Sequence, residues 1–63
     1  MKLYRLMSKG MKVDITSMEK VLNYYRIKFI RIEDEAEWYI YTTEGKAEMI
    51  SEMYNVECML INE

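Results

Sequence analysis

The chain has 63 residues, enough for a single domain, 1–63, with a small core, and 51% of them are hydrophobic, which argues against a disordered tail. No apolar run approaches the roughly 20 residues that span a bilayer. Cys58 is the only cysteine. It excludes a disulfide framework within the chain and, with no signal peptide, predicts a reducing, cytoplasmic setting.

The net charge of −2 conceals an uneven distribution. Residues 1–31 carry eight basic and two acidic side chains, a net charge of +6, whereas residues 32–63 carry one basic and nine acidic side chains, a net charge of −8. Such a division indicates a charge-directed partner or head-to-tail contact with a second copy. The alternative is that the two halves pack together and neutralise each other within one domain.

The first part of the chain predicts a strand, a link and a helix. Residues 2–8 alternate as a strand with both faces partly apolar. We interpret residues 11–15 as an irregular link, with a short returning strand as the alternative. Thr16 and Glu19 have the spacing of a capping box for a helix that ends near Arg26. The apolar stripe of this helix consists of Met18, Val21, Leu22 and Tyr25.

Residues 27–43 predict a hairpin, because two segments rich in β-branched and aromatic residues flank the acidic segment 33–37. This segment lacks glycine, so we expect a wide turn. Side chains alternate between the two faces of a strand. On the face under the helices we expect Ile30, Ile32, Trp38 and Ile40. On the uncovered face we expect Phe29, Arg31, Tyr39 and Tyr41.

A second helix is expected to begin after its cap, Thr43, and to stop at Asn55 in the left-handed conformation. Its inner stripe would consist of Ala47, Ile50, Met53 and Tyr54. Its outer side carries acids four residues apart, Glu44, Glu48 and Glu52. The last strand, 56–61, would place Val56, Cys58 and Leu60 on one face and Glu57, Met59 and Ile61 on the other.

This order of elements predicts an α+β fold, the small β-α-β-β-α-β ferredoxin-like sandwich, with a four-stranded antiparallel sheet and two helices on one face. The first and third strands are then central. The uncovered face would hold Tyr4 beside Tyr39 and Tyr41, with Phe29 and Arg31 on the neighbouring strand. Because the fold carries many unrelated functions, it does not by itself indicate one.

The composition argues against catalysis. The chain has no histidine, which excludes Ser–His and Cys–His nucleophiles and every metal site that needs histidine. One cysteine cannot hold zinc or an iron–sulfur cluster, and two glycines leave no phosphate-binding loop. We therefore predict no enzyme, no metal site and no cofactor, and we expect Cys58 to be a small buried apolar residue rather than a reactive thiol.

The first candidate surface is the aromatic sheet face of Tyr4, Phe29, Arg31, Tyr39 and Tyr41. A face rich in tyrosine with an arginine is typical of a protein interface. RNA-recognition modules of the same topology stack bases on such a face. The net negative charge and the missing glycine–aromatic signature of the third strand argue against nucleic acid here. A further alternative is that these side chains only stabilise the sheet through cross-strand pairs.

The second candidate surface is acidic. Glutamates four apart lie about 6 Å from one another along a helix, close to the spacing of phosphates along a strand, which indicates docking to a basic groove. The alternative is a solvated face that keeps the protein soluble. The set consists of Glu33, Asp34, Glu35 and Glu37 in the turn and Glu44, Glu48 and Glu52 on the helix.

We therefore predict a small non-enzymatic protein-binding module that acts through the aromatic sheet face on a protein partner or, as a homodimer, on a second copy. The first alternative is an acidic inhibitor of the phage or mobile-element type that docks on a nucleic-acid-handling protein. The second alternative is a binder of single-stranded nucleic acid.

Overall fold

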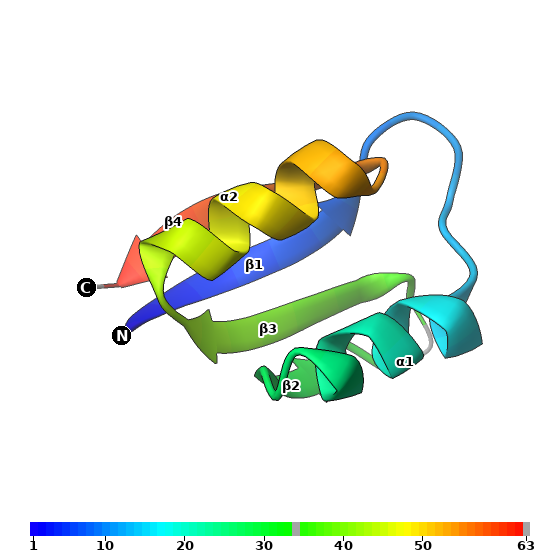
Figure 1. Ribbon diagram of the computed structural model, residues 1–63. Coiled ribbons are helices and arrows are strands. Elements are labelled where there is room, and N and C mark those ends of the chain that lie inside the picture. The colour runs from blue at the N-terminus through cyan, green and yellow to red at the C-terminus, as the bar shows by residue number, and fades with distance from the viewer. Residues whose placement is uncertain (34, 63) are drawn as a thin grey trace.

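A computed structural model describes residues 1–33 and 35–62 and confirms the predicted order of elements. The elements are β1 (Lys2–Ser8), α1 (Ile15–Tyr24), β2 (Lys28–Arg31), β3 (Glu37–Thr42), α2 (Glu44–Met53) and β4 (Val56–Asn62). The four strands form one antiparallel sheet in the order β2-β3-β1-β4, so β1 and β3 are central, as predicted. Both helices cover the same face, α1 beside β2 and β3 and α2 beside β1 and β4 (Figure 1). This is the ferredoxin-like sandwich. Within the described residues, neither helix is long and apolar enough to cross a membrane.

The core lies between the sheet and the helices, and Trp38 on β3 is its largest fully buried side chain. The predicted stripe of α1 is confirmed, since Met18 and Leu22 are buried and its other two members pack against the core. The stripe of α2 is confirmed in part: Ala47 and Ile50 are buried and Tyr54 packs against the core, whereas Met53 is exposed. The fully buried side chains are Leu6, Leu22, Trp38, Ile40, Thr42, Ile50 and Val56.

The start of α1 differs from the prediction. Its cap is Asp14 rather than Thr16, and the Asp14 carboxylate accepts from the Ser17 N–H and hydroxyl, each at 2.9 Å. The hydrogen bond from the Ser17 N–H lowers the pKa of Asp14 below its ordinary value. A carboxylate is at least as good a cap as a threonine hydroxyl, so the capping box of Thr16 and Glu19 was wrong. Glu19 is thereby available for another contact.

The end of α1 near Arg26 is as predicted, whereas the end of α2 differs from the prediction. Arg26, with φ 57°, takes the left-handed position after α1, and the Ile27 N–H donates to the Leu22 carbonyl at 2.9 Å. This is a Schellman motif, in which the residue after the left-handed one also contacts the helix through an apolar side chain. For α2 the cap Thr43 is confirmed by its bond from the Lys46 N–H. The left-handed stop at Asn55 was wrong, because that residue has no positive φ.

The faces of the central strand β3 are as predicted, but those of β1 and β2 are reversed. Trp38 and Ile40 are buried. Phe29 lies opposite Ile40 and packs against the core, whereas Ile30 lies opposite Tyr39 on the uncovered face and is 71% exposed. Tyr4 also lies opposite Ile40 and is only 6% exposed. The predicted burial of Ile30 and exposure of Tyr4 and Phe29 were therefore wrong.

The connections are irregular. Residues 11–14 form no strand, which confirms the link, and Gly10 at its start has φ 87°, a conformation that favours glycine. The hairpin of β2 and β3 closes with the Ile32 N–H donating to the Glu37 carbonyl at 2.9 Å. Ile32 is half-buried. Asp34, in the predicted acidic turn, lies outside the described residues.

Candidate protein interface

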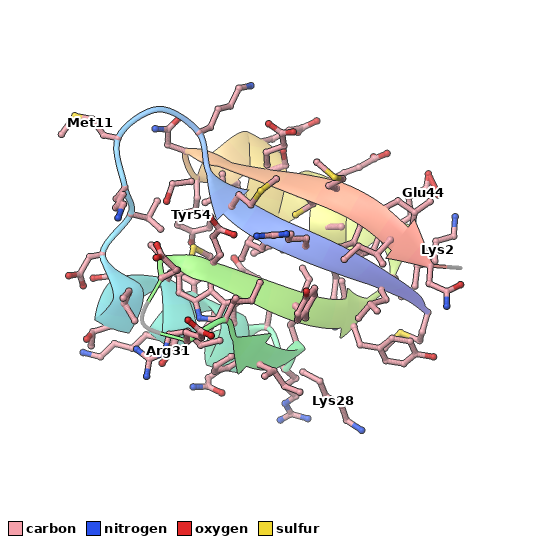
Figure 2. All side chains as sticks on the ribbon, turned by 180° about the vertical axis from the view of Figure 1, so that it is seen from behind. Lys2, Met11, Lys28, Arg31, Glu44 and Tyr54 are labelled. Carbon is pink, nitrogen blue, oxygen red and sulfur yellow. The ribbon has the colours of Figure 1, made fainter. Side chains whose placement is uncertain are left out.

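The face of the sheet opposite the helices is uncovered by any described element (Figure 2). Strand pairing aligns Ile30, Tyr39, Arg5 and Met59 in one row across all four strands. A neighbouring row contains Lys28, Tyr41 and Leu3. We call these seven residues, Leu3, Arg5, Lys28, Ile30, Tyr39, Tyr41 and Met59, the open face.

Of the aromatic face predicted from the sequence, only Tyr39 and Tyr41 lie on the open face. Tyr4 is buried on the helix side, and Phe29 is half-buried there. Arg31 is exposed, but it lies opposite Trp38 on the helix side, with its Nε 3.5 Å from the Glu19 carboxylate. The open face is therefore more aliphatic than predicted, because Ile30 of β2 and Leu3 of β1 lie on it in place of Phe29 and Tyr4.

The charge in the middle of the open face is neutralised within the chain. The Arg5 guanidinium donates to the Glu37 carboxylate through its Nε, at 3.1 Å, and through one terminal nitrogen. This hydrogen bond raises the pKa of Arg5 above its ordinary value. The exposed Lys28 lies on the β2 edge, and Glu57, opposite Met7, lies on the β4 edge. A neutral centre between oppositely charged edges makes this face suitable for apolar docking.

The open face continues at the start of β2 into a shallow hollow of about 660 Å³. Its lining includes Leu3, Tyr39 and Tyr41 from the open face. Arg26 and Lys28 contribute basic side chains. A hollow of mixed apolar and basic lining can receive an apolar side chain and an acidic one from a docked protein.

A second candidate surface is a groove of about 350 Å³ between α2 and β4. Its apolar lining includes Tyr4, Ala47, Cys58 and Leu60. The predicted helix acids Glu44, Glu48 and Glu52 line the same groove and are exposed. The structure thus brings these three acids together with an apolar floor, which the spacing along the helix alone did not predict.

The acids of this groove differ in their pairing. Glu44 is 3.2 Å from the Lys2 ammonium, and both are labelled at one end of the molecule in Figure 2. Among residues 1–33 and 35–62, Glu48 and Glu52 form no ion pair. The described acids of the turn do not join them, because Glu37 pairs with Arg5 and the Glu35 carboxylate lies 3.8 Å from the Lys12 ammonium.

The ion pairs also bear on the charge division of the sequence. Lys2–Glu44, Arg5–Glu37 and Lys12–Glu35 each join the basic half to the acidic half, so the halves partly neutralise each other. The division nevertheless persists across the sheet. Residues 15–31, with α1 and β2, hold four basic side chains and one acid, a net charge of +3. Residues 44–62, with α2 and β4, hold four acids and one base, a net charge of −3.

Cys58 lies in the α2–β4 groove and is half-buried. Burial raises the pKa of its thiol from 9.0 to about 11. A thiol with a raised pKa is a poor nucleophile at neutral pH. Within the part of the chain that the structure describes, no group of three or more cysteine and acidic side chains could hold a metal ion.

We expect iodoacetamide at pH 8 to alkylate Cys58 far more slowly in the folded protein than in urea, as measured by mass spectrometry. Between about pH 9 and pH 11 the unfolded chain releases the thiol proton that the folded chain retains, so stability should fall as the pH rises through this interval. The variant Cys58→Ser should show neither the alkylation nor this part of the pH dependence. Equal alkylation rates in the folded and unfolded states would contradict the expectation.

Comparison of the chain with models of protein families, with curated proteins and with solved structures finds no match.

Proposed function

We propose that the protein is a non-enzymatic protein-binding module whose open face docks onto the open face of a second copy. The observation that supports this proposal is the exposure of Ile30. It is 71% exposed and lies on the sheet in one row with Tyr39 and Met59. Contiguous exposed apolar patches on small proteins are typical of binding surfaces. Two uncovered sheet faces can pack about 10 Å apart as a sandwich. A protein of this size, with an expected stability of only about 3–9 kcal/mol, also gains from such burial.

The charge distribution supports a second copy as the occupant. A two-fold axis that runs along the strands between two open faces places the β2 edge of one copy over the β4 edge of the other. The side of one copy with a net charge of +3 then covers the side of the other with a net charge of −3. An axis across the strands would place like edges over each other. The charges therefore favour the first arrangement.

The same arrangement matches the apolar side chains. Ile30 and Met59 are the two ends of the row that contains Tyr39 and Arg5. The axis reverses this row, so Met59 of one copy lies over Ile30 of the other. A face of four short strands is smaller than the roughly 800 Å² per partner of a standard interface. We therefore expect a dimer of micromolar affinity that dissociates on dilution.

The double variant Tyr39→Ala, Tyr41→Ala tests this function by sedimentation over a range of concentrations. We expect the wild type to form dimers and the double variant to sediment as a monomer with an unchanged circular dichroism spectrum, because both rings lie on the exposed side of β3. Tyr24→Ala is the matched control, since Tyr24 is 79% exposed on α1 and lies outside the open face. A wild type that stays monomeric at the highest concentration, or a double variant that still dimerises, would contradict the proposal.

An acidic protein that docks on a basic partner is the second candidate function. One observation favours it, namely that Glu44, Glu48 and Glu52 line a single groove with an apolar floor. This candidate uses a surface separate from the open face.

A further inference from the structure

Among the described residues, the β4 edge of the sheet is irregular only near its end, where Leu3 pairs with Asn62 and Tyr4 with Leu60, so that Ile61 is left out of the ladder. The strand has seven residues and is paired on one side only, with β1. Edge strands are commonly blocked by lysine, proline or very short length. β4 contains neither lysine nor proline, and Met59, Leu60 and Ile61 are each between 45% and 49% exposed. The free edge of this strand can therefore accept the backbone of an additional strand.

The available part of β4 begins after its first residue. The Ser51 hydroxyl donates to the Val56 carbonyl at 3.1 Å, and the Val56 side chain is fully buried. From Glu57 to Leu60, before the irregularity, the edge lies beside the α2–β4 groove, whose lining includes Leu60 and Cys58. A strand added to β4 would thus project alternate side chains toward α2.

The acids of α2 define which side chains suit that position. Residues four apart on a helix are separated by about 6 Å along its axis. Residues two apart on a strand are separated by about 6.6–6.8 Å and point to the same face. Glu48 and Glu52 therefore match the spacing of two basic side chains placed two residues apart on an added strand. Both glutamates are exposed, and neither is paired with a residue in the described parts of the chain.

We infer that the α2–β4 groove binds an extended segment of a partner protein, which pairs with β4 as a fifth strand and carries lysine or arginine at alternate positions facing Glu48 and Glu52. Backbone hydrogen bonds to β4 would supply affinity, and the glutamates would select a basic sequence. This inference goes beyond the proposed dimer, because the groove and the open face consist of different residues.

The charges argue against a second copy in this groove. Symmetric pairing of β4 with β4 would bring two acidic α2 helices close together, which is unfavourable. Pairing of β4 with β2 of another copy would join opposite charges, but Lys28 and Arg31 are three apart and so lie on opposite faces of β2. That pairing also has no closed symmetry and would continue into an open chain of molecules.

The test uses a synthetic peptide of about six residues, the common strand length, in which lysine and valine alternate. Its binding is followed by chemical shifts and amide hydrogen exchange of the isotope-labelled full-length protein. We expect the amides of β4 to shift and to become protected, and binding to weaken with added salt. A peptide in which glutamate replaces lysine is the control for charge. A lysine–valine peptide methylated on alternate backbone nitrogens is the control for strand pairing.

The variant Glu48→Lys, Glu52→Lys should lose several-fold in affinity for the lysine–valine peptide. The matched control is Glu33→Lys, Glu35→Lys, which changes the net charge equally at exposed positions outside the groove. Tyr39→Ala, Tyr41→Ala should retain peptide binding even if it abolishes the dimer, so the two proposals can fail separately.

Several outcomes would overturn the inference. They are the absence of peptide binding, equal binding of the glutamate–valine peptide, equal losses in the two charge variants, or shifts confined to the open face. Assemblies that grow beyond a dimer in the absence of peptide, and that Glu48→Lys, Glu52→Lys removes, would assign the groove to a second copy instead.

Discussion

Replacement of Trp38 by alanine is expected to unfold the protein. The Trp38 side chain is fully buried and is the largest in the core. Removal of a buried tryptophan costs about 3–5 kcal/mol, whereas the whole domain is expected to have only about 3–9 kcal/mol of stability. We expect Trp38→Ala to lose most of its far-ultraviolet circular dichroism at room temperature, or to unfold at a much lower urea concentration.

Trp38→Phe is the control for this variant, because phenylalanine keeps an aromatic ring in the core but loses the pyrrole part of the indole with its N–H. We expect it to stay folded with reduced stability. If Trp38→Ala retained the wild-type urea midpoint, the position of Trp38 at the centre of the core would be wrong.

The second large effect is expected at Glu19. Its carboxylate accepts a hydrogen bond of 2.8 Å from the indole Nε1 of Trp38 and lies 3.5 Å from the Nε of Arg31. Alanine at this position leaves the buried indole N–H without an acceptor and removes a hydrogen bond to a charged group, which is worth about 1.5–3 kcal/mol. Glu19→Ala should therefore lower the free energy of unfolding by about that amount, as measured by urea denaturation with Trp38 fluorescence as the probe.

Glu19→Gln separates the hydrogen bond from the charge, since the amide oxygen can still accept from the indole. We expect this variant to lose less stability than Glu19→Ala. Glu33→Ala, at an exposed position, controls for the removal of an acid elsewhere. Equal losses in the two Glu19 variants would show that the charge, rather than the indole hydrogen bond, is what stabilises this contact.

The fold was predictable from the sequence because local signals agreed with one another. The helical stripe of α1, the cap at Thr43 and the alternation of β3 all appear in the structure as expected. Where two local signals competed, the prediction was wrong. Asp14 and Thr16 both suit a helix cap, and the geometry of the link selects Asp14.

The composition of the open face was less predictable, because β1 and β2 each have large apolar side chains on both faces. In β2, Phe29 and Ile30 are equally suited to the core, and only the pairing of Phe29 with Ile40 decides between them. In β1, Arg5 and Tyr4 point to opposite faces of the sheet. The charge of Arg5 could have indicated that Tyr4 lies on the buried face. When both faces of a strand are apolar, its neighbours in the sheet thus determine which of its side chains face the core.

The groove between α2 and β4 depends on tertiary packing. The spacing of Glu48 and Glu52 was visible in the sequence, but the position of Leu60 beside them follows from the placement of β4 at the edge next to α2. Local pattern therefore predicted the charged wall of the groove and not its floor.

The two chain ends described by the structure lie side by side, because β1 and β4 are antiparallel neighbours and Leu3 pairs with Asn62 (Figure 1). A stretching force applied through these ends would separate β1 from β4 beginning at one end of the ladder. Its hydrogen bonds would then break a few at a time rather than all together. The protein should then yield mechanically at low force, with β4 detaching first while β1 stays paired with β3. A partner strand paired with β4 would move away from α2 together with β4. Tension on the ends would therefore also take the partner out of the groove between α2 and β4.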